Sequence, residues 1–88
     1  MPLVKLYAGL RSAAGVKETH IEGDRLPGIL SALVEKHPAL NGAVLDGDRL
    51  RPHVLVTVNG RHIDPEQGLD ISIAAEDQIA LFPPIAGG

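Results

Sequence analysis

The chain has 88 residues, no cysteine and a formal charge of -3 at pH 7. A chain of this length forms one small domain that buries roughly 60 % of the surface of its unfolded form, so it has no room for a deep active site. The absence of cysteine excludes disulfides, thiolate nucleophiles and iron–sulfur ligation by this chain. Because the basic residues are scattered and the only aromatic side chains are Tyr7 and Phe82, nucleic acid is not an expected partner.

The N-terminal part of the chain predicts two strands. In residues 3–8, strict alternation places Val4, Leu6 and Ala8 on one face and the intervening residues on the other. A second alternation over residues 17–22 predicts a strand that pairs antiparallel with the first, the two being joined by a loop. No apolar run in this segment is long enough for a signal peptide or a membrane span, so we expect a cytoplasmic protein with no membrane partner.

Residues 24–37 carry the clearest helical pattern in the sequence. The residues that recur at the spacing of one helical face are Leu26, Ile29, Leu30, Leu33 and Val34. Asp24 is the predicted N-cap, Pro27 is tolerated in the first turn, and Pro38 should end the helix. A further short helical turn is expected around residues 40–44.

The following segment predicts a turn and then a hairpin. Residues 46–48 read Asp-Gly-Asp, which is typical of a turn, and residues 53–58 alternate as a strand. Asn59-Gly60 is a strong signal for a two-residue hairpin turn. Residues 61–64 are therefore the predicted returning strand.

The last predicted strand, residues 78–82, places Ile79 and Leu81 on one face and is ended by two prolines. The resulting order of elements predicts an α+β fold of the β-grasp (ubiquitin-like) type. In such a fold, a mixed sheet of about five strands has one main helix across it, because a single amphipathic helix needs one sheet face to cover. The β-grasp domain would span residues 1–82 and lead into an extended, flexible C-terminal tail, residues 83–88.

The tail, which reads Pro-Pro-Ile-Ala-Gly-Gly, carries the predicted chemistry. Its prolines favour an extended course that reaches about 20 Å, and its small residues can pass a narrow channel in a partner. A free carboxylate at Gly88 is a poor acyl donor, but its attack on the α-phosphate of ATP would give an acyl-adenylate. The chain has no Gly-rich phosphate-binding motif, so ATP and magnesium would belong to an activating partner and no cofactor to this chain.

Two segments of the sequence resemble the MoaD/ThiS family of ubiquitin-like sulfur-carrier proteins, and most closely its MoaD-like branch. Residues 6–8, Leu-Tyr-Ala, followed by Arg11 and Gly15, are similar to the family's opening strand and turn. Residues 81–88, Leu-Phe-Pro-Pro-Ile-Ala-Gly-Gly, are similar to its terminal signature almost position for position.

This resemblance implies that a ubiquitin-activating-type adenylyltransferase adenylates Gly88, which then becomes a thiocarboxylate that donates sulfur in biosynthesis. Molybdopterin is the favoured product, with a larger molybdopterin-synthase-type subunit as a further partner. The chain would then be a non-catalytic sulfur-carrying subunit or co-substrate. The partner-binding residues carried over from the family are Gly87, Ala86, Ile85, Pro84, Pro83, Phe82 and Tyr7. Core packing is the ordinary role of an aromatic residue, but alternation places both rings opposite the apolar face and favours exposed anchors.

Other functions stay open at this point. Residues 49–64 and the Ala-Gly-Gly ending also resemble carriers that feed cysteine synthesis and small protein modifiers, and thiamine synthesis and tRNA thiolation are further destinations for the sulfur. A binding module with an inert tail is the structural alternative. No metal site is predicted, because the histidines are too dispersed along the chain: His20, His37, His53 and His62.

Overall fold

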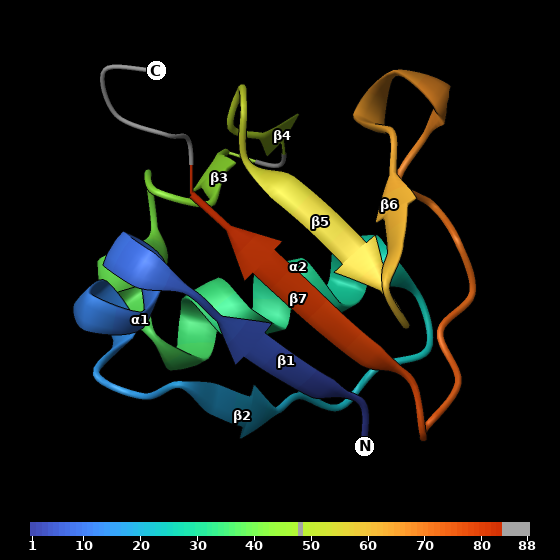
Figure 1. The fold of residues 1–88 in the computed structure, drawn as a ribbon, viewed down its shortest axis with the longest axis horizontal. Helices are drawn as coiled ribbons and strands as arrows, with labels where there is room; N and C mark the ends of the chain where they lie inside the picture. The colour runs from blue at the N-terminus through green and yellow to red at the C-terminus, as the bar shows by residue number, and fades with distance from the viewer. Residues whose placement is uncertain (48, 84–88) are drawn as a thin grey trace.

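The structure is a computed structural model that describes residues 1–47 and 49–83, with the backbone but not the side chain of Glu66. Figure 1 shows a five-stranded sheet with the order β2-β1-β7-β5-β6. Its strands are β1 (Leu3–Leu6), β2 (Glu18–His20), β5 (Leu55–Val58), β6 (Arg61–Ile63) and β7 (Gln78–Phe82). A separate pair consists of β3 (Leu45–Asp46) and β4 (Arg49–Leu50). The helices are α1 (Ala8–Ala14) and α2 (Leu26–Lys36), with short 3-10 helices η1 (Pro38–Leu40) and η2 (Pro65–Gln67).

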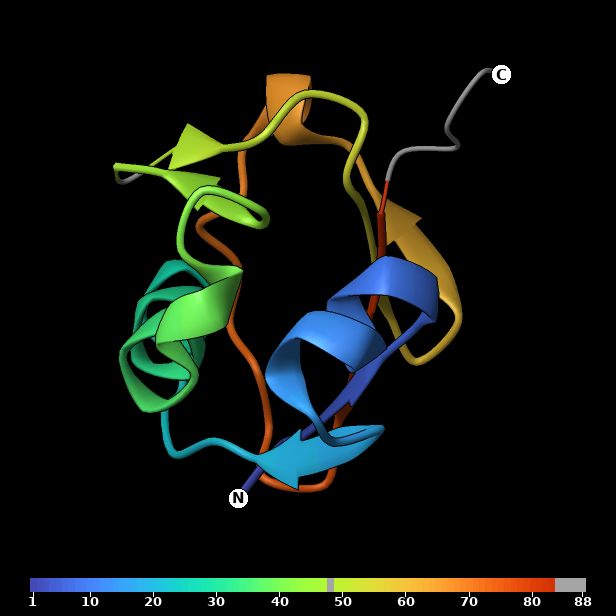
Figure 2. The same ribbon diagram turned by 90° about the vertical axis from the view of Figure 1, so that its left-hand side faces the viewer.

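The sheet is mixed. Strands β1 and β7 run parallel at its centre, with Leu6 opposite Leu81, whereas β2, β5 and β6 join through antiparallel pairs. Helix α2 lies on one side of this sheet (Figure 2). The predicted β-grasp fold, a mixed sheet with one main helix across it, is confirmed.

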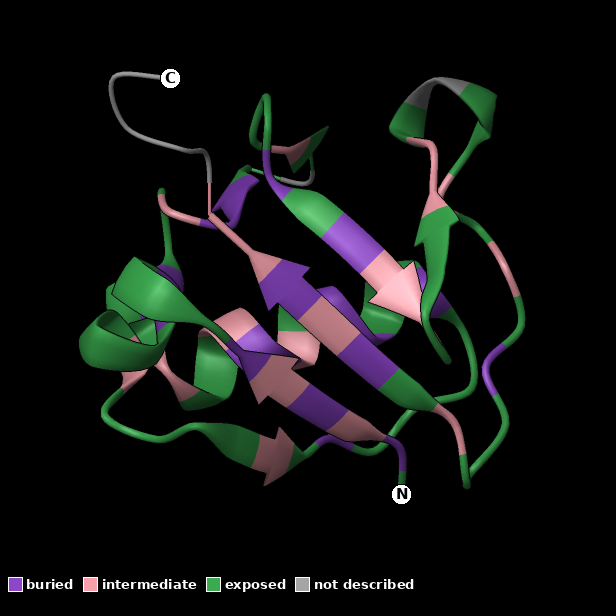
Figure 3. Ribbon diagram, in the orientation of Figure 1, coloured by how far each residue is buried: buried purple, intermediate pink, exposed green. Residues whose placement is uncertain are grey.

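The hydrophobic core fills the space between α2 and the inner face of the sheet. Figure 3 shows buried positions alternating with less buried ones along β1 and β7. The buried core residues of these two strands and of α2 are Val4, Leu6, Ile79, Leu81, Leu26, Ile29, Leu30 and Leu33. The predicted inner positions Val4, Leu6, Ile79 and Leu81 are therefore confirmed, whereas Ala8 is not an inner position. The predicted apolar face of α2 is also confirmed, apart from Val34, which is half-buried.

The connection between the first two strands differs from the prediction. Its residues form α1 and not a loop, and Ala8, which we expected on the inner face of the first strand, is exposed as the first residue of that helix. Ala8 has a φ of 49°, so the backbone leaves the strand through a left-handed residue. The helix ends at Gly15, also left-handed, whose N–H donates to the Arg11 carbonyl at 2.9 Å.

The start of α2 also differs, because its N-cap is Arg25 and not Asp24. No side chain caps the first turn. The Leu26 N–H instead donates to the carbonyl of Ile71 at 3.0 Å. A backbone acceptor from a distant loop therefore replaces the predicted side-chain cap.

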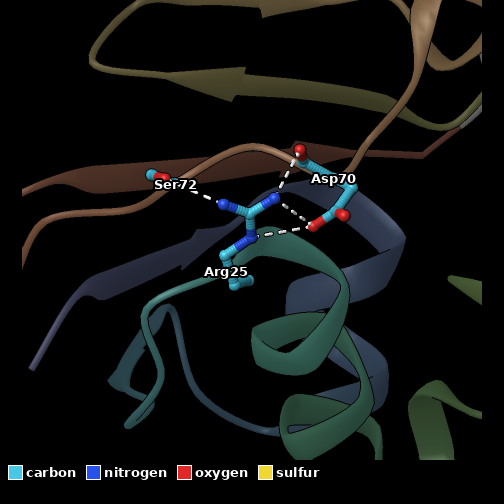
Figure 4. A network of polar contacts seen from close by, with 3 residues as sticks. All are labelled: Arg25, Asp70 and Ser72. Carbon is cyan, nitrogen blue, oxygen red and sulfur yellow. Dashed lines mark hydrogen bonds and ion pairs between the residues drawn. The ribbon is translucent and has the colours of Figure 1, made fainter.

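The Arg25 side chain adds polar contacts to the same junction (Figure 4). Its guanidinium donates to the carboxylate of Asp70 at 2.8 Å and to the hydroxyl of Ser72 at 3.0 Å. Both members of the ion pair are exposed, with side-chain exposures of 48 % and 74 %, so the pair contributes at most about 1 kcal/mol. The contact mainly fixes the loop before β7 against the start of α2.

The predicted hairpin at Asn59-Gly60 is confirmed. Asn59 has a φ of 52° and Gly60 a φ of 82°, as a type I′ turn between β5 and β6 requires. The strand before it begins at Leu55 and not at residue 53, because His53 has a φ of 67°. At the predicted turn in residues 46–48, the chain forms the short β3–β4 pair, and Asp48 lies outside the described residues.

Asn59 also connects this hairpin to the beginning of β7. Its amide donates to the Asp77 carboxylate at 2.9 Å, and its amide oxygen accepts the Gln78 N–H at 2.9 Å. The Ala74 N–H donates to the other oxygen of Asp77 at 2.7 Å. The Asn59 bond and then the Ala74 bond lower the pKa of Asp77 below its ordinary value, because both stabilise the ionised carboxylate.

Candidate partner-binding site

The predicted tail follows the most central strand of the sheet. Strand β7 pairs with β1 on one side and β5 on the other up to its last residues, where Leu81 faces Leu6 and Phe82 faces Leu55. Pro83 follows and is half-buried. Backbone ladders on both sides therefore fix the base of the tail.

The remaining tail residues are outside the described part of the chain: Pro84, Ile85, Ala86, Gly87 and Gly88. Their predicted roles stay predictions. The described residues of the candidate site lie at the base of the tail.

Tyr7 and Phe82 form a stacked aromatic pair at this base. Their ring centroids are 4.5 Å apart and the ring planes differ by 13°. The parallel register explains the contact. Leu6 is paired with Leu81, so the residues that follow them, Tyr7 and Phe82, lie next to each other. Tyr7 is 37 % exposed, Phe82 is half-buried, and neither belongs to the buried core.

Leu55 extends this pair across a third strand, and sequence reasoning missed it. It is paired with Phe82 in the β5–β7 register and is 45 % exposed. Directly opposed residues of a sheet point to the same face. Tyr7, Phe82 and Leu55 therefore form what we call the apolar row, on the face of the sheet opposite α2. The alternation over residues 53–58 was a signal for an outward Leu55, but only the register shows that Leu55 aligns with Phe82.

The apolar row is suited to contact and not to catalysis. Exposed aromatic side chains with an aliphatic neighbour are typical anchors for a protein partner. Among the side chains that the structure describes, no cluster of histidines and carboxylates could hold a metal ion. Within residues 1–47 and 49–83, no helix combines the length and apolar character needed to cross a bilayer.

The sheet order, the parallel central pair β1–β7 and the main helix α2 across one face define a ubiquitin-like protein. The sequence model described as the ThiS family matches residues 4–88. The chain therefore belongs to the ThiS family of ubiquitin-like sulfur carriers.

Proteins similar to this chain include small archaeal modifier proteins. Small archaeal modifier protein 1 of Haloferax volcanii is 40 % identical over 88 residues, which cover 96 % of this chain and 97 % of that protein. The solution structure of small archaeal modifier protein 1 from Methanosarcina acetivorans superposes with a TM-score of 0.86 at 33 % identity, covering 99 % of this chain and 95 % of that one. A chain of the BexX/CysO complex from Amycolatopsis orientalis has a TM-score of 0.84 and full coverage of both chains, but at 21 % identity it shows the shared fold alone.

Proposed function

We propose that this chain is a sulfur carrier whose C-terminal carboxylate, at Gly88, is activated by a ubiquitin-activating-type adenylyltransferase. One observation carries the proposal: the central strand β7 ends at the apolar row, and the sequence continues from it as Pro-Pro-Ile-Ala-Gly-Gly. The match to the ThiS family extends through residue 88 and so includes this segment.

The activation step uses the two ends of the proposed site differently. Tyr7, Phe82 and Leu55 dock on the enzyme and fix the direction of the tail, and Pro83 to Gly88 enter its cleft. When the domain is docked, the Gly88 carboxylate is held near the α-phosphate of ATP, so less entropy is lost on reaching the reactive geometry. The enzyme supplies ATP and magnesium.

The bonds change in two steps. A carboxylate oxygen of Gly88 attacks the α-phosphorus of ATP, and pyrophosphate leaves with the electron pair of the broken P–O bond. Hydrosulfide then attacks the carbonyl carbon of the acyl-adenylate and loses its proton to solvent, and AMP leaves as the C–O bond breaks. The product is the thiocarboxylate, which can pass its sulfur to an acceptor in biosynthesis.

The MoaD-like character of the two ends of the sequence favours a molybdopterin precursor as acceptor, held by a larger synthase subunit. A protein-modifier function is the second candidate, and the 40 % identity to small archaeal modifier protein 1 favours it. In that case a lysine amine attacks the carbonyl carbon of the acyl-adenylate at Gly88 and loses a proton, AMP leaves as the C–O bond breaks, and an isopeptide bond forms. Both functions need the same adenylation, and they differ in the nucleophile that follows.

The test is intact-mass spectrometry after incubation with ATP, magnesium, the activating enzyme of the same organism and a sulfide donor. We expect a mass increase that matches exchange of one oxygen for sulfur. A chain that lacks Gly88 should show no increase, whereas Arg61→Ala, at the far edge of the sheet, should react like the wild type.

The outcomes separate the candidates. Thiocarboxylate formation without protein adducts supports the carrier, and isopeptide-linked adducts to lysines support the modifier. If the wild type acquires neither sulfur nor AMP and joins no protein, the proposed function is overturned and the tail is inert.

A further inference from the structure

A positively charged hollow lies beside the apolar row, toward β2. It has a volume of about 200 Å³ and is lined by Lys5, Leu6, Tyr7, Arg11, Lys17 and Glu18. Three cations and one carboxylate give this basic hollow a formal charge of +2, although the whole chain carries -3. The remainder of the molecule is therefore more negative than the net charge suggests.

Three elements bring the cations together. Lys5 lies on β1 and is paired with Glu18 of β2. Lys17 immediately precedes β2, and its carbonyl accepts the Leu6 N–H at 2.8 Å. Arg11 comes from α1, the helix that the first strand enters directly after Tyr7.

Glu18 offsets one charge of the basic hollow, and none of its three cations forms a salt bridge within the described part of the chain. In residues 1–47 and 49–83, the ion pair that forms is between Arg25 and Asp70, away from the hollow. Arg11 and Lys17 are exposed and Lys5 is half-buried. Their charge is therefore available to a partner, at the edge of the proposed docking surface.

We propose that the basic hollow binds an acidic segment of the activating enzyme and thereby orients the domain for insertion of its tail. This inference rests on the proposed function, and it further specifies that the enzyme surface facing the hollow is acidic. Protein interfaces commonly combine an apolar centre with a charged rim, which steers association and fixes the register of the two partners. Here the apolar row is the centre and the basic hollow is the rim.

The distribution of charge supports an acidic protein segment as the occupant. When this acidic domain approaches an acidic surface of a partner, most of the domain is repelled, and the basic hollow is attracted. The hollow lies next to Tyr7, so the favoured approach presents the end of the sheet from which the tail leaves. Glu18 lines the same hollow and opposes the partner's carboxylates, so its removal should strengthen the interaction.

The experiment measures two quantities for each variant with the activating enzyme. ATP–pyrophosphate exchange gives kcat and KM for the carrier, and calorimetric titration without ATP gives Kd. The main variant, Arg11→Glu, and the second, Lys17→Glu, each reverse a positive charge of the hollow. Glu18→Gln removes the hollow's negative charge, so its effect should be opposite. Arg61→Glu is the matched control because it reverses the charge of another exposed cation, on the far edge strand β6. Thermal unfolding checks that each variant is folded.

We expect Arg11→Glu and Lys17→Glu to raise KM and Kd about three- to tenfold at low salt, with kcat unchanged. Glu18→Gln should lower both constants, and Arg61→Glu should leave them within about twofold of the wild type. Added salt should weaken binding of the wild type to the enzyme and reduce the difference in Kd between the wild type and Arg11→Glu.

The inference is overturned if Arg61→Glu acts as strongly as Arg11→Glu, or if neither KM nor Kd depends on the charges of the hollow. Failure of the proposed function looks different. In that case the wild type supports no pyrophosphate exchange, whereas the titration still reports whether the basic hollow governs binding to the enzyme.

Discussion

Successive residues of β1 and β7 point to opposite faces of the sheet, and the two faces differ in burial (Figure 3). The inner positions are Val4, Leu6, Ile79 and Leu81, each at most 1 % exposed. The outer positions include Lys5, Tyr7, Ala80 and Phe82, which are half-buried or exposed. The inner face stabilises the fold against α2, and the outer face carries the apolar row and the basic hollow. Substitutions on the two faces should therefore affect different measurements.

The largest expected effect is on the inner face. Ile79→Ala removes a fully buried side chain and leaves a cavity between β7 and α2, which costs about 2–5 kcal/mol in the free energy of unfolding. Urea denaturation followed by circular dichroism measures this loss. The matched change on the outer face, Phe82→Ala, should cost less, because Phe82 is only half-buried. Equal costs at the two positions would contradict the division between the faces.

The aromatic pair tests the outer face directly. A double-mutant cycle with Tyr7→Ala and Phe82→Ala should give a coupling of about 0.5–1.5 kcal/mol in stability, as expected for stacked rings. Each truncation should also weaken binding of the activating enzyme more than it destabilises the fold, because it removes an anchor of the apolar row. A calorimetric titration of the folded variants checks this. Unchanged affinity in both variants would assign the pair a packing role only.

The features predicted correctly from the sequence depend on local patterns. Alternation over residues 78–82 gave the last strand and its buried face, and Asn59-Gly60 gave the hairpin, because each signal is complete within a few residues. Helix α1 was missed for a related reason. It lacks a side-chain N-cap and begins at a left-handed Ala8, so the usual starting signal is absent; Gly15 at its end was the signal that could have revealed it.

Contacts between distant residues could not be predicted in the same way. The Ile71 carbonyl replaces the expected Asp24 cap of α2, and nothing near residue 24 indicates this partner. For the candidate site, alternation placed Tyr7 and Phe82 on the outer face, but their stacking and the alignment of Leu55 depend on the β1–β7 and β5–β7 registers. Register is set by the assembled sheet and not by either strand alone.

The smallest expected effect lies at the opposite end of β7, where Asp77 accepts hydrogen bonds from Asn59 and Ala74. Because these bonds lower its pKa in the folded state, the ionised carboxylate stabilises the fold above the unfolded pKa of about 3.9. That contribution is lost as the pH falls through the lower folded-state pKa. Asp77→Asn should therefore lower the melting temperature slightly at pH 7, and the difference from the wild type should vanish at the acidic end of a titration.

Glu76→Gln removes the same charge from the neighbouring residue and is the control. A difference between Asp77→Asn and the wild type that persists at low pH would mean that the Asp77 side chain acts through shape and not through its charge. Binding through the apolar row should be the same in both variants as in the wild type, since that row lies at the other end of the strand.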